Sequence, residues 1–89
     1  MRFGHTIILV ECKNYTSTVQ KKEIDKFLAD VSGSGAHIGI FISMGFSISG
    51  KKKIDVERDG SRLLGFAVLQ SDSDLSGLGV MIRSMLATQ

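Results

Sequence analysis

Glu11-Cys12-Lys13 places a carboxylate and an ammonium group two residues apart near the start of the sequence. An ionised carboxylate is a hard oxygen ligand for Mg²⁺ or Mn²⁺, and the carbonyl of Cys12 can supply a second oxygen. The ammonium of Lys13 can position an attacking water or stabilise negative charge that develops on a phosphorus centre. By residue type, Glu11 and Cys12 could therefore hold Mg²⁺ or Mn²⁺ and Lys13 could act on a phosphate, but Glu-x-Lys by itself is also common on protein surfaces.

The apolar segment before this pair predicts how the two charges are presented. Residues 7–10 are all aliphatic, and such a run indicates a strand covered on both faces. Because side chains of a strand alternate between its faces, Leu9, Glu11 and Lys13 share one face. Burying charges there costs free energy, which favours a functional role. The alternative is a pair of exposed charges at the end of a strand.

Lysines form two further clusters that could contact phosphates. One comprises Lys21, Lys22 and Lys26, and the other comprises Lys51, Lys52 and Lys53. The alternative is solvated surface lysines, because a net charge of +2 does not by itself indicate a nucleic-acid partner. Gln20, beside the first cluster, is predicted as a helix-capping residue first and as a substrate contact second.

A helix and a second strand are predicted after the first strand. Residues 18–31 carry apolar side chains at three- and four-residue spacing, which indicates a helix with one buried face. Ser17 and Gln20 match a capping box for its N-terminus. Residues 37–43 form another largely apolar run and predict a second buried strand. A strand, a helix and a strand in this order indicate a right-handed crossover with parallel pairing.

The second half of the chain is predicted to complete a mixed sheet. Asp59-Gly60 indicates a hairpin, and a short irregular or helical piece over residues 50–57 is the alternative. Residues 65–69 predict a strand in either case, and Asp72 or Ser73 is predicted to cap a final helix. The apolar stripe of this helix comprises Leu75, Leu78, Met81, Ile82, Met85 and Leu86. The expected fold class is α/β, a mixed sheet flanked by helices, in one domain over residues 1–89.

Composition excludes several other classes of protein. With one cysteine in the chain, no internal disulfide and no multi-cysteine zinc site can form, which fits a reducing, cytoplasmic compartment. The apolar runs are shorter than a membrane span, and the N-terminus lacks the pattern of a signal peptide. No glycine-rich phosphate loop of the P-loop or dinucleotide type is present. The sequence therefore predicts no membrane partner and no nucleotide cofactor of those types.

Two segments resemble a known family when they are taken together in order. The first is Ile8-Leu9-Val10-Glu11-Cys12-Lys13-Asn14-Tyr15, and the second is Gly39-Ile40-Phe41-Ile42-Ser43-Met44-Gly45-Phe46-Ser47. With the helix between them, they resemble restriction-endonuclease-like proteins of the Mrr kind over residues 6–47. The resemblance implies a PD-(D/E)xK nuclease core that hydrolyses DNA phosphodiesters with a divalent metal. It also implies that Glu11 is the metal-binding acid and Lys13 the catalytic lysine.

The sequence departs from this family pattern at two places. The family's first acid lies on a strand before Glu-x-Lys, but no acidic residue precedes Glu11. The helix that follows the Gly-Phe-Ser loop in the Mrr group is also not evident over residues 48–53. One interpretation of the first departure is that the core lacks its first strands. The missing acid would then be supplied by an upstream segment, a homodimer partner or further domains. A second interpretation is that His5 replaces the missing ligand.

The expected function is that of a divalent-metal-dependent DNA endonuclease core, with DNA as its partner. The alternative is a catalytically inactive nucleic-acid-binding or oligomerisation module of the same fold. Because a single acid would hold the metal loosely and orient the attacking water badly, the 89-residue chain is expected to be a poor nuclease by itself.

Overall fold

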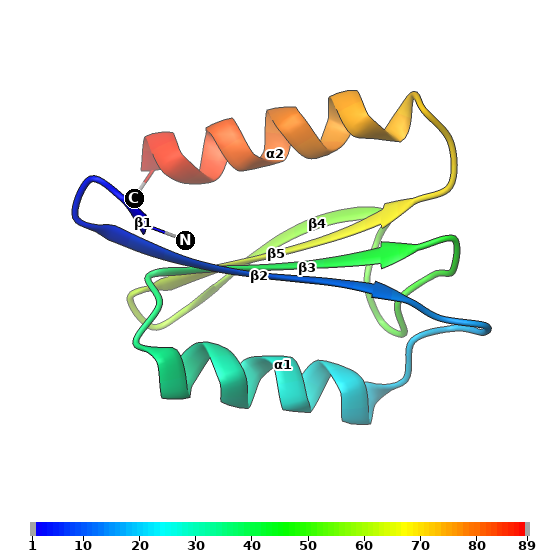
Figure 1. Ribbon diagram of the computed structural model, residues 1–89, viewed down its shortest axis with the longest axis horizontal. Helices are drawn as coiled ribbons and strands as arrows, with labels where there is room; N and C mark the ends of the chain where they lie inside the picture. The colour runs from blue at the N-terminus through cyan, green and yellow to red at the C-terminus, as the bar shows by residue number, and fades with distance from the viewer. Residues whose placement is uncertain (1, 89) are drawn as a thin grey trace.

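The chain forms one mixed sheet with a helix on each face (Figure 1). The structure, a computed structural model, describes residues 2–88. The elements along the chain are β1 (Arg2–Phe3), β2 (Thr6–Asn14), α1 (Lys21–Ser34), β3 (Ile38–Met44), β4 (Ile54–Asp59), β5 (Arg62–Leu69) and α2 (Asp74–Thr88). The strand order is β1-β2-β3-β5-β4, so the predicted α/β class with a mixed sheet is confirmed.

The central strands β2, β3 and β5 are parallel, and the two edge strands pair antiparallel to their neighbours. The predicted β2–α1–β3 crossover is therefore confirmed. The prediction that β2 is covered on both faces is not fully confirmed, because the side chain of Val10 is 42% exposed. The reason is that α2 packs mainly against β5 and β4, which leaves part of this face of β2 open. No helix within residues 2–88 is long and apolar enough to cross a membrane.

Helix α1 begins three residues later than the sequence pattern predicts. Val19 is 1% exposed and forms a parallel bridge with Ile48, in which its N–H donates to the Ser47 carbonyl at 2.9 Å. This pairing holds the backbone extended before the helix, so the capping box from Ser17 to Gln20 is wrong. Gln20 is itself the N-cap residue, with an extended backbone and no capping hydrogen bond from its side chain.

Three phenylalanines form the centre of the core between α1 and the sheet. Phe27 of α1 packs edge-to-face on Phe41 of β3 and Phe66 of β5, at centroid distances of 5.3 and 5.8 Å. Gly39 of β3 lets α1 approach closely, because a Cβ atom there would lie 2.6 Å from Val31 Cγ2 and 3.0 Å from Phe27 Cζ. The distance between α1 and the sheet is thus limited by the missing side chain of Gly39.

The hairpin predicted at Asp59-Gly60 is confirmed. Asp59 pairs with Arg62 across the turn, and Gly60 has a φ of +63°, a conformation that glycine adopts without strain. The alternative of a helical piece over residues 50–57 is wrong, because Ile54–Asp59 is strand β4. Residues 48–53 contain no helix, as the sequence indicates.

Helix α2 covers the opposite face through Met81 and Met85, which are 3% and 1% exposed. The carboxylate of Asp74 holds the turn before it, accepting hydrogen bonds from the N–H groups of Gln70 and Ser71. The Lys53 ammonium at 2.8 Å, and then these backbone hydrogen bonds, lower the pKa of Asp74 to about 2. Ser73, one of the two predicted caps, lies directly before the first residue of α2, and its hydroxyl contacts that of Ser71.

The predicted apolar stripe of α2 is buried in its middle and not at its start. Leu75 is 57% exposed, so its place in the stripe is wrong. The reason is that the buried face is centred on Met81 and Met85, and Leu75 lies at the margin of this face in the first turn.

Candidate active site

Glu11 and Lys13 lie in the carboxyl half of β2, on the face that α1 covers. Leu9, two residues earlier, packs against the core on the α1 side, whereas Ile8 belongs to the core on the α2 side. The alternation along β2 that the sequence predicts is therefore confirmed. In the parallel pairing, Glu11 is beside Phe41 of β3.

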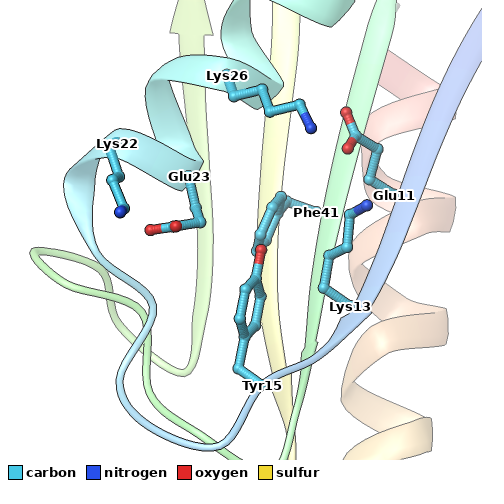
Figure 2. A pocket seen from close by; sticks show the side chains of 7 residues that line it. All are labelled: Glu11, Lys13, Tyr15, Lys22, Glu23, Lys26 and Phe41. Atoms are coloured by element: carbon cyan, nitrogen blue, oxygen red, sulfur yellow. The ribbon is translucent and has the colours of Figure 1, made fainter.

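A pocket of about 350 Å³ lies between this face of β2 and α1 (Figure 2). The ring of Tyr15, from the segment after β2, stacks on that of Phe41 with centroids 6.4 Å apart. Burial, and then the carboxylates of Glu23 and Glu11, raise the pKa of Tyr15, so its hydroxyl keeps its proton at neutral pH. The pocket is lined by Glu11, Lys13, Tyr15, Lys22, Glu23, Lys26 and Phe41.

The carboxyl of Glu11 lies between charges of both signs. Burial raises its pKa, and the neighbouring carboxyl of Asp30 in α1 raises it further, whereas Lys13 and Lys26 act in the opposite direction. The ammonium of Lys26 points toward this carboxyl from α1 in Figure 2. Glu11 Oε2 is buried and has no hydrogen-bond partner within residues 2–88. The site therefore contains a buried carboxylate oxygen whose capacity to accept is unused.

The first predicted lysine cluster is divided between two sides of α1. Lys22 and Lys26 line the pocket that contains Glu11. Lys21 instead pairs with Asp25, with 3.0 Å between Nζ and Oδ2, and borders a second groove of about 440 Å³. The pocket thus receives two lysines from α1 in addition to Lys13 of β2, and none of the three is in an ion pair in the described part of the chain.

The second predicted lysine cluster lies outside the pocket. Lys51 pairs with Glu57 of β4, and its ammonium is 4.6 Å from the centroid of the Phe66 ring. Lys53 pairs with Asp74 at the start of α2. Lys52 is exposed, and its backbone N–H donates to Asp55. Two of these three ammonium groups are therefore already neutralised by a carboxylate.

Three other residues singled out in the sequence also lie away from the pocket. Gln20 donates from its side-chain amide to the Thr18 carbonyl at 3.3 Å. The side chain of Cys12 is exposed, on the face of β2 opposite Glu11. His5 lies in the turn between β1 and β2, about 20 Å along the strand from Glu11 at roughly 3.3 Å per residue. His5 is therefore too far away to replace the missing acid.

The sequence alone did not single out Glu23, which lines the pocket, or Asp30, whose carboxyl raises the pKa of Glu11. Glu23, Lys26 and Asp30 follow one another at spacings of three and four, which places them on one flank of α1. This spacing is visible in the sequence. Which flank of the helix lies over Glu11 depends on the rotation of α1 about its own axis. The spacing of the apolar residues determines this rotation only to within about one residue.

Within residues 2–88, no three His, Cys, Asp or Glu side chains are grouped so that they could hold a metal ion. Glu11 nevertheless fits a hard cation, because its buried Oε2 is an oxygen donor without a partner. A cation bound here would take its other ligands from water, the backbone or a carboxylate close to Glu11.

The mixed sheet with its parallel β2–α1–β3 unit and the Glu-x-Lys pair at the end of β2 define an α/β domain of the restriction-endonuclease-like class. Residues 1–60 match the model of the Mrr-type restriction endonuclease family, and the chain belongs to this family. The resemblance seen in the sequence is thereby confirmed, and the domain is of the nuclease type. No curated protein and no solved structure matches the chain.

Proposed function

We propose that the chain is the catalytic core of a divalent-metal-dependent endonuclease that hydrolyses DNA phosphodiesters. The observation that supports this most is the pocket itself, where Glu11 and Lys13 meet on one face of β2 in a chain of a nuclease family. Glu11 would hold Mg²⁺ or Mn²⁺ through its buried oxygen, with the carbonyl of Cys12 as a second ligand. When bound, the ion would supply Lewis-acid polarisation of the phosphodiester.

The chain's own residues divide the remaining work in this proposal. Lys13, which lines the pocket, donates hydrogen bonds to the oxygens on which negative charge develops. Lys22 and Lys26 bind flanking phosphates from α1, since neither is neutralised by an ion pair in the described residues. Tyr15 and Phe41 form an apolar wall that limits the access of water from one side.

The alternative is a catalytically inactive nucleic-acid-binding or oligomerisation module of the same fold. One observation favours it: the described residues contain no group of three metal-ligating side chains. The two functions differ in what removal of Glu11 does. An inactive module keeps its DNA affinity and shows no metal-dependent cleavage in any variant.

Cleavage of supercoiled plasmid DNA with Mg²⁺ or Mn²⁺ tests the proposal. Glu11→Gln and Lys13→Met should each lower the rate of nicking about a hundredfold or more, because each removes a group that acts on the reacting phosphate. Asp59→Asn and Lys52→Met are matched controls for charge, since both residues are exposed and outside the pocket. Equal nicking by Glu11→Gln and the unaltered chain would refute the proposal.

A further inference from the structure

The hydroxyl group of Tyr15 has no hydrogen-bond partner within residues 2–88, although the ring that carries it is packed. The ring is half-buried and stacks on Phe41, with 6.4 Å between the two centroids. Because Phe41 is beside Glu11 in the parallel pairing, this contact brings the ring from the segment after β2 back toward Glu11. In Figure 2 the hydroxyl is at the end of the ring that lies between α1 and β2, in the pocket. The fold therefore uses the ring of Tyr15 and leaves its hydroxyl donor free.

The surroundings of this hydroxyl suit an anion. The pocket is lined by three ammonium groups, those of Lys13, Lys22 and Lys26, which outnumber the two carboxylates of Glu11 and Glu23. None of the three is in an ion pair in the part of the chain that the structure describes. A phenol hydroxyl is a hydrogen-bond donor at neutral pH, and tyrosine is one of the residues that bind the phosphate oxygens of DNA. The free donor and the unpaired ammonium groups thus favour the same ligand, a phosphodiester oxygen.

We propose that the Tyr15 hydroxyl donates a hydrogen bond to a phosphate oxygen of the DNA strand in the pocket, and so positions that strand against Glu11 and Lys13. The inference rests on the proposed function and adds a contact from the segment after β2. The alternative is that Tyr15 contributes only its ring, through packing. An uncharged hydroxyl adds to the affinity without releasing a counterion from the DNA, which separates its contribution from that of a lysine.

The variant Tyr15→Phe tests the proposal, because it removes one oxygen atom and keeps the ring on Phe41. Binding to a short labelled DNA duplex is measured by fluorescence anisotropy without divalent metal, so that no turnover occurs. Tyr15→Phe should weaken binding about fivefold through the lost hydrogen bond and leave the slope of log K against log salt concentration unchanged. Lys22→Ala should instead reduce that slope by about 0.9. Ser49→Ala is the matched control, since it removes a hydroxyl that borders the second groove, and it should leave the affinity unchanged.

The unaltered chain also carries its own probe of the pocket. Tyr15 is the only tyrosine in the sequence, and there is no tryptophan, so tyrosine fluorescence comes from this position alone. The fluorescence should change as the duplex binds and should saturate at the same duplex concentration as the anisotropy.

Each outcome separates this inference from the function on which it rests. If Tyr15→Phe binds the duplex as tightly as the unaltered chain while Lys22→Ala binds it less tightly, Tyr15 serves packing alone and the proposed function stands. If Tyr15→Phe lowers the midpoint of urea unfolding as well as the affinity, the hydroxyl acts on the fold and the inference fails. If the tyrosine fluorescence does not respond to bound duplex, DNA binds elsewhere and both proposals fail.

Discussion

Glu11 combines two properties that oppose each other in the metal-free protein. Its carboxyl is close to that of Asp30, and its Oε2 atom is buried without a donor. Both raise the free energy of the folded state, because an unpaired buried acceptor forfeits its hydrogen bond to water. A residue that destabilises the fold and yet occupies a pocket is typical of functional sites.

We predict that Glu11→Gln stabilises the metal-free protein at pH 7 by about 0.5–1.5 kcal/mol. The glutamine amide removes one negative charge and can donate a hydrogen bond to Asp30. Urea unfolding measures the change. When Mn²⁺ is added, the unaltered chain should become more stable than Glu11→Gln. An ion at a hundred times its dissociation constant stabilises the unaltered chain by about 2.7 kcal/mol and the variant by little. A variant that is less stable than the unaltered chain without metal would contradict this account of Glu11.

At this scale the sequence predicts the strand residues of the site better than those of the helix. The period of a strand is two, so placing Leu9 inward also places Glu11 and Lys13. Asp30 and Lys26 could not be assigned in the same way. A helix turns by about 100° per residue, and a small rotation about its axis decides whether a flanking residue faces Glu11 or the solvent.

At the scale of elements, the closeness of α1 to the sheet sets the width of the site. Gly39 lies beneath Val31 and Phe27, on the strand next to β2. A methyl group there would push against two packed side chains of α1 and lift the helix. The pocket between α1 and Glu11 would then widen, although no residue that lines it has been altered.

Gly39→Ala is expected to destabilise the protein by about 1–3 kcal/mol and to weaken Mn²⁺ binding. Gly65→Ala is the matched control on the other face of the sheet, where a new Cβ would meet the flexible ends of Met85 and Met81 at 2.7 and 3.0 Å. Those side chains can move aside, so Gly65→Ala should cost less and leave Mn²⁺ affinity unchanged. Stability comes from urea unfolding and affinity from Mn²⁺ titration. Equal loss of affinity in both variants would show that overall stability, and not the height of α1, controls the site.

The order and type of the elements from β2 to α2 could be predicted from the sequence, but β1 and the start of α1 could not. The pattern of Ser17 and Gln20 is a sound local signal for a capping box. It was overruled by a contact distant in the sequence, the bridge between Val19 and Ile48, which buries both side chains. Local propensity contains no information about such pairing, whereas the hairpin at Gly60 depends on adjacent residues and was predicted correctly.

At the scale of the whole molecule, the positive charges are less uniform than the two lysine clusters suggest. Lys21, Lys51 and Lys53 are each paired with a carboxylate, whereas Lys22 and Lys26 lie together over the pocket without such a pair in the described chain. Unpaired lysines release more counterions from a phosphate backbone than paired ones. The pocket is therefore the part of the surface where we expect DNA to bind most strongly.

The salt dependence of DNA binding tests this distribution. Lys22→Ala with Lys26→Ala should reduce the slope of log K against log salt concentration by about 1 to 2, since each phosphate contact contributes roughly 0.9. Lys21→Ala with Lys53→Ala removes the same charge from residues that are already paired and should reduce the slope by less. Fluorescence anisotropy with a short duplex at several salt concentrations gives both slopes. Equal slopes for the two double variants would mean that paired and unpaired lysines contribute equally to DNA binding.

The 89-residue chain is still expected to cleave DNA poorly by itself, because the single acid Glu11 would hold a metal ion loosely. The residues matched by the family model end at position 60, but β5 lies between β3 and β4, so the sheet needs the segment after that position.

Strand β2 has a further consequence for the behaviour of the protein at high concentration. β1 pairs only with Thr6 and Ile7, and from Leu9 onward no other strand of the described chain lies along the outer edge of β2. Such an open edge is a template for a strand of another molecule, and charged side chains are the usual protection against that. Glu11 and Lys13 are the charges on this stretch, beside the exposed Val10. We therefore expect the two residues proposed to perform the chemistry also to protect this edge from self-association, and a variant that neutralises both should aggregate more readily than either single change.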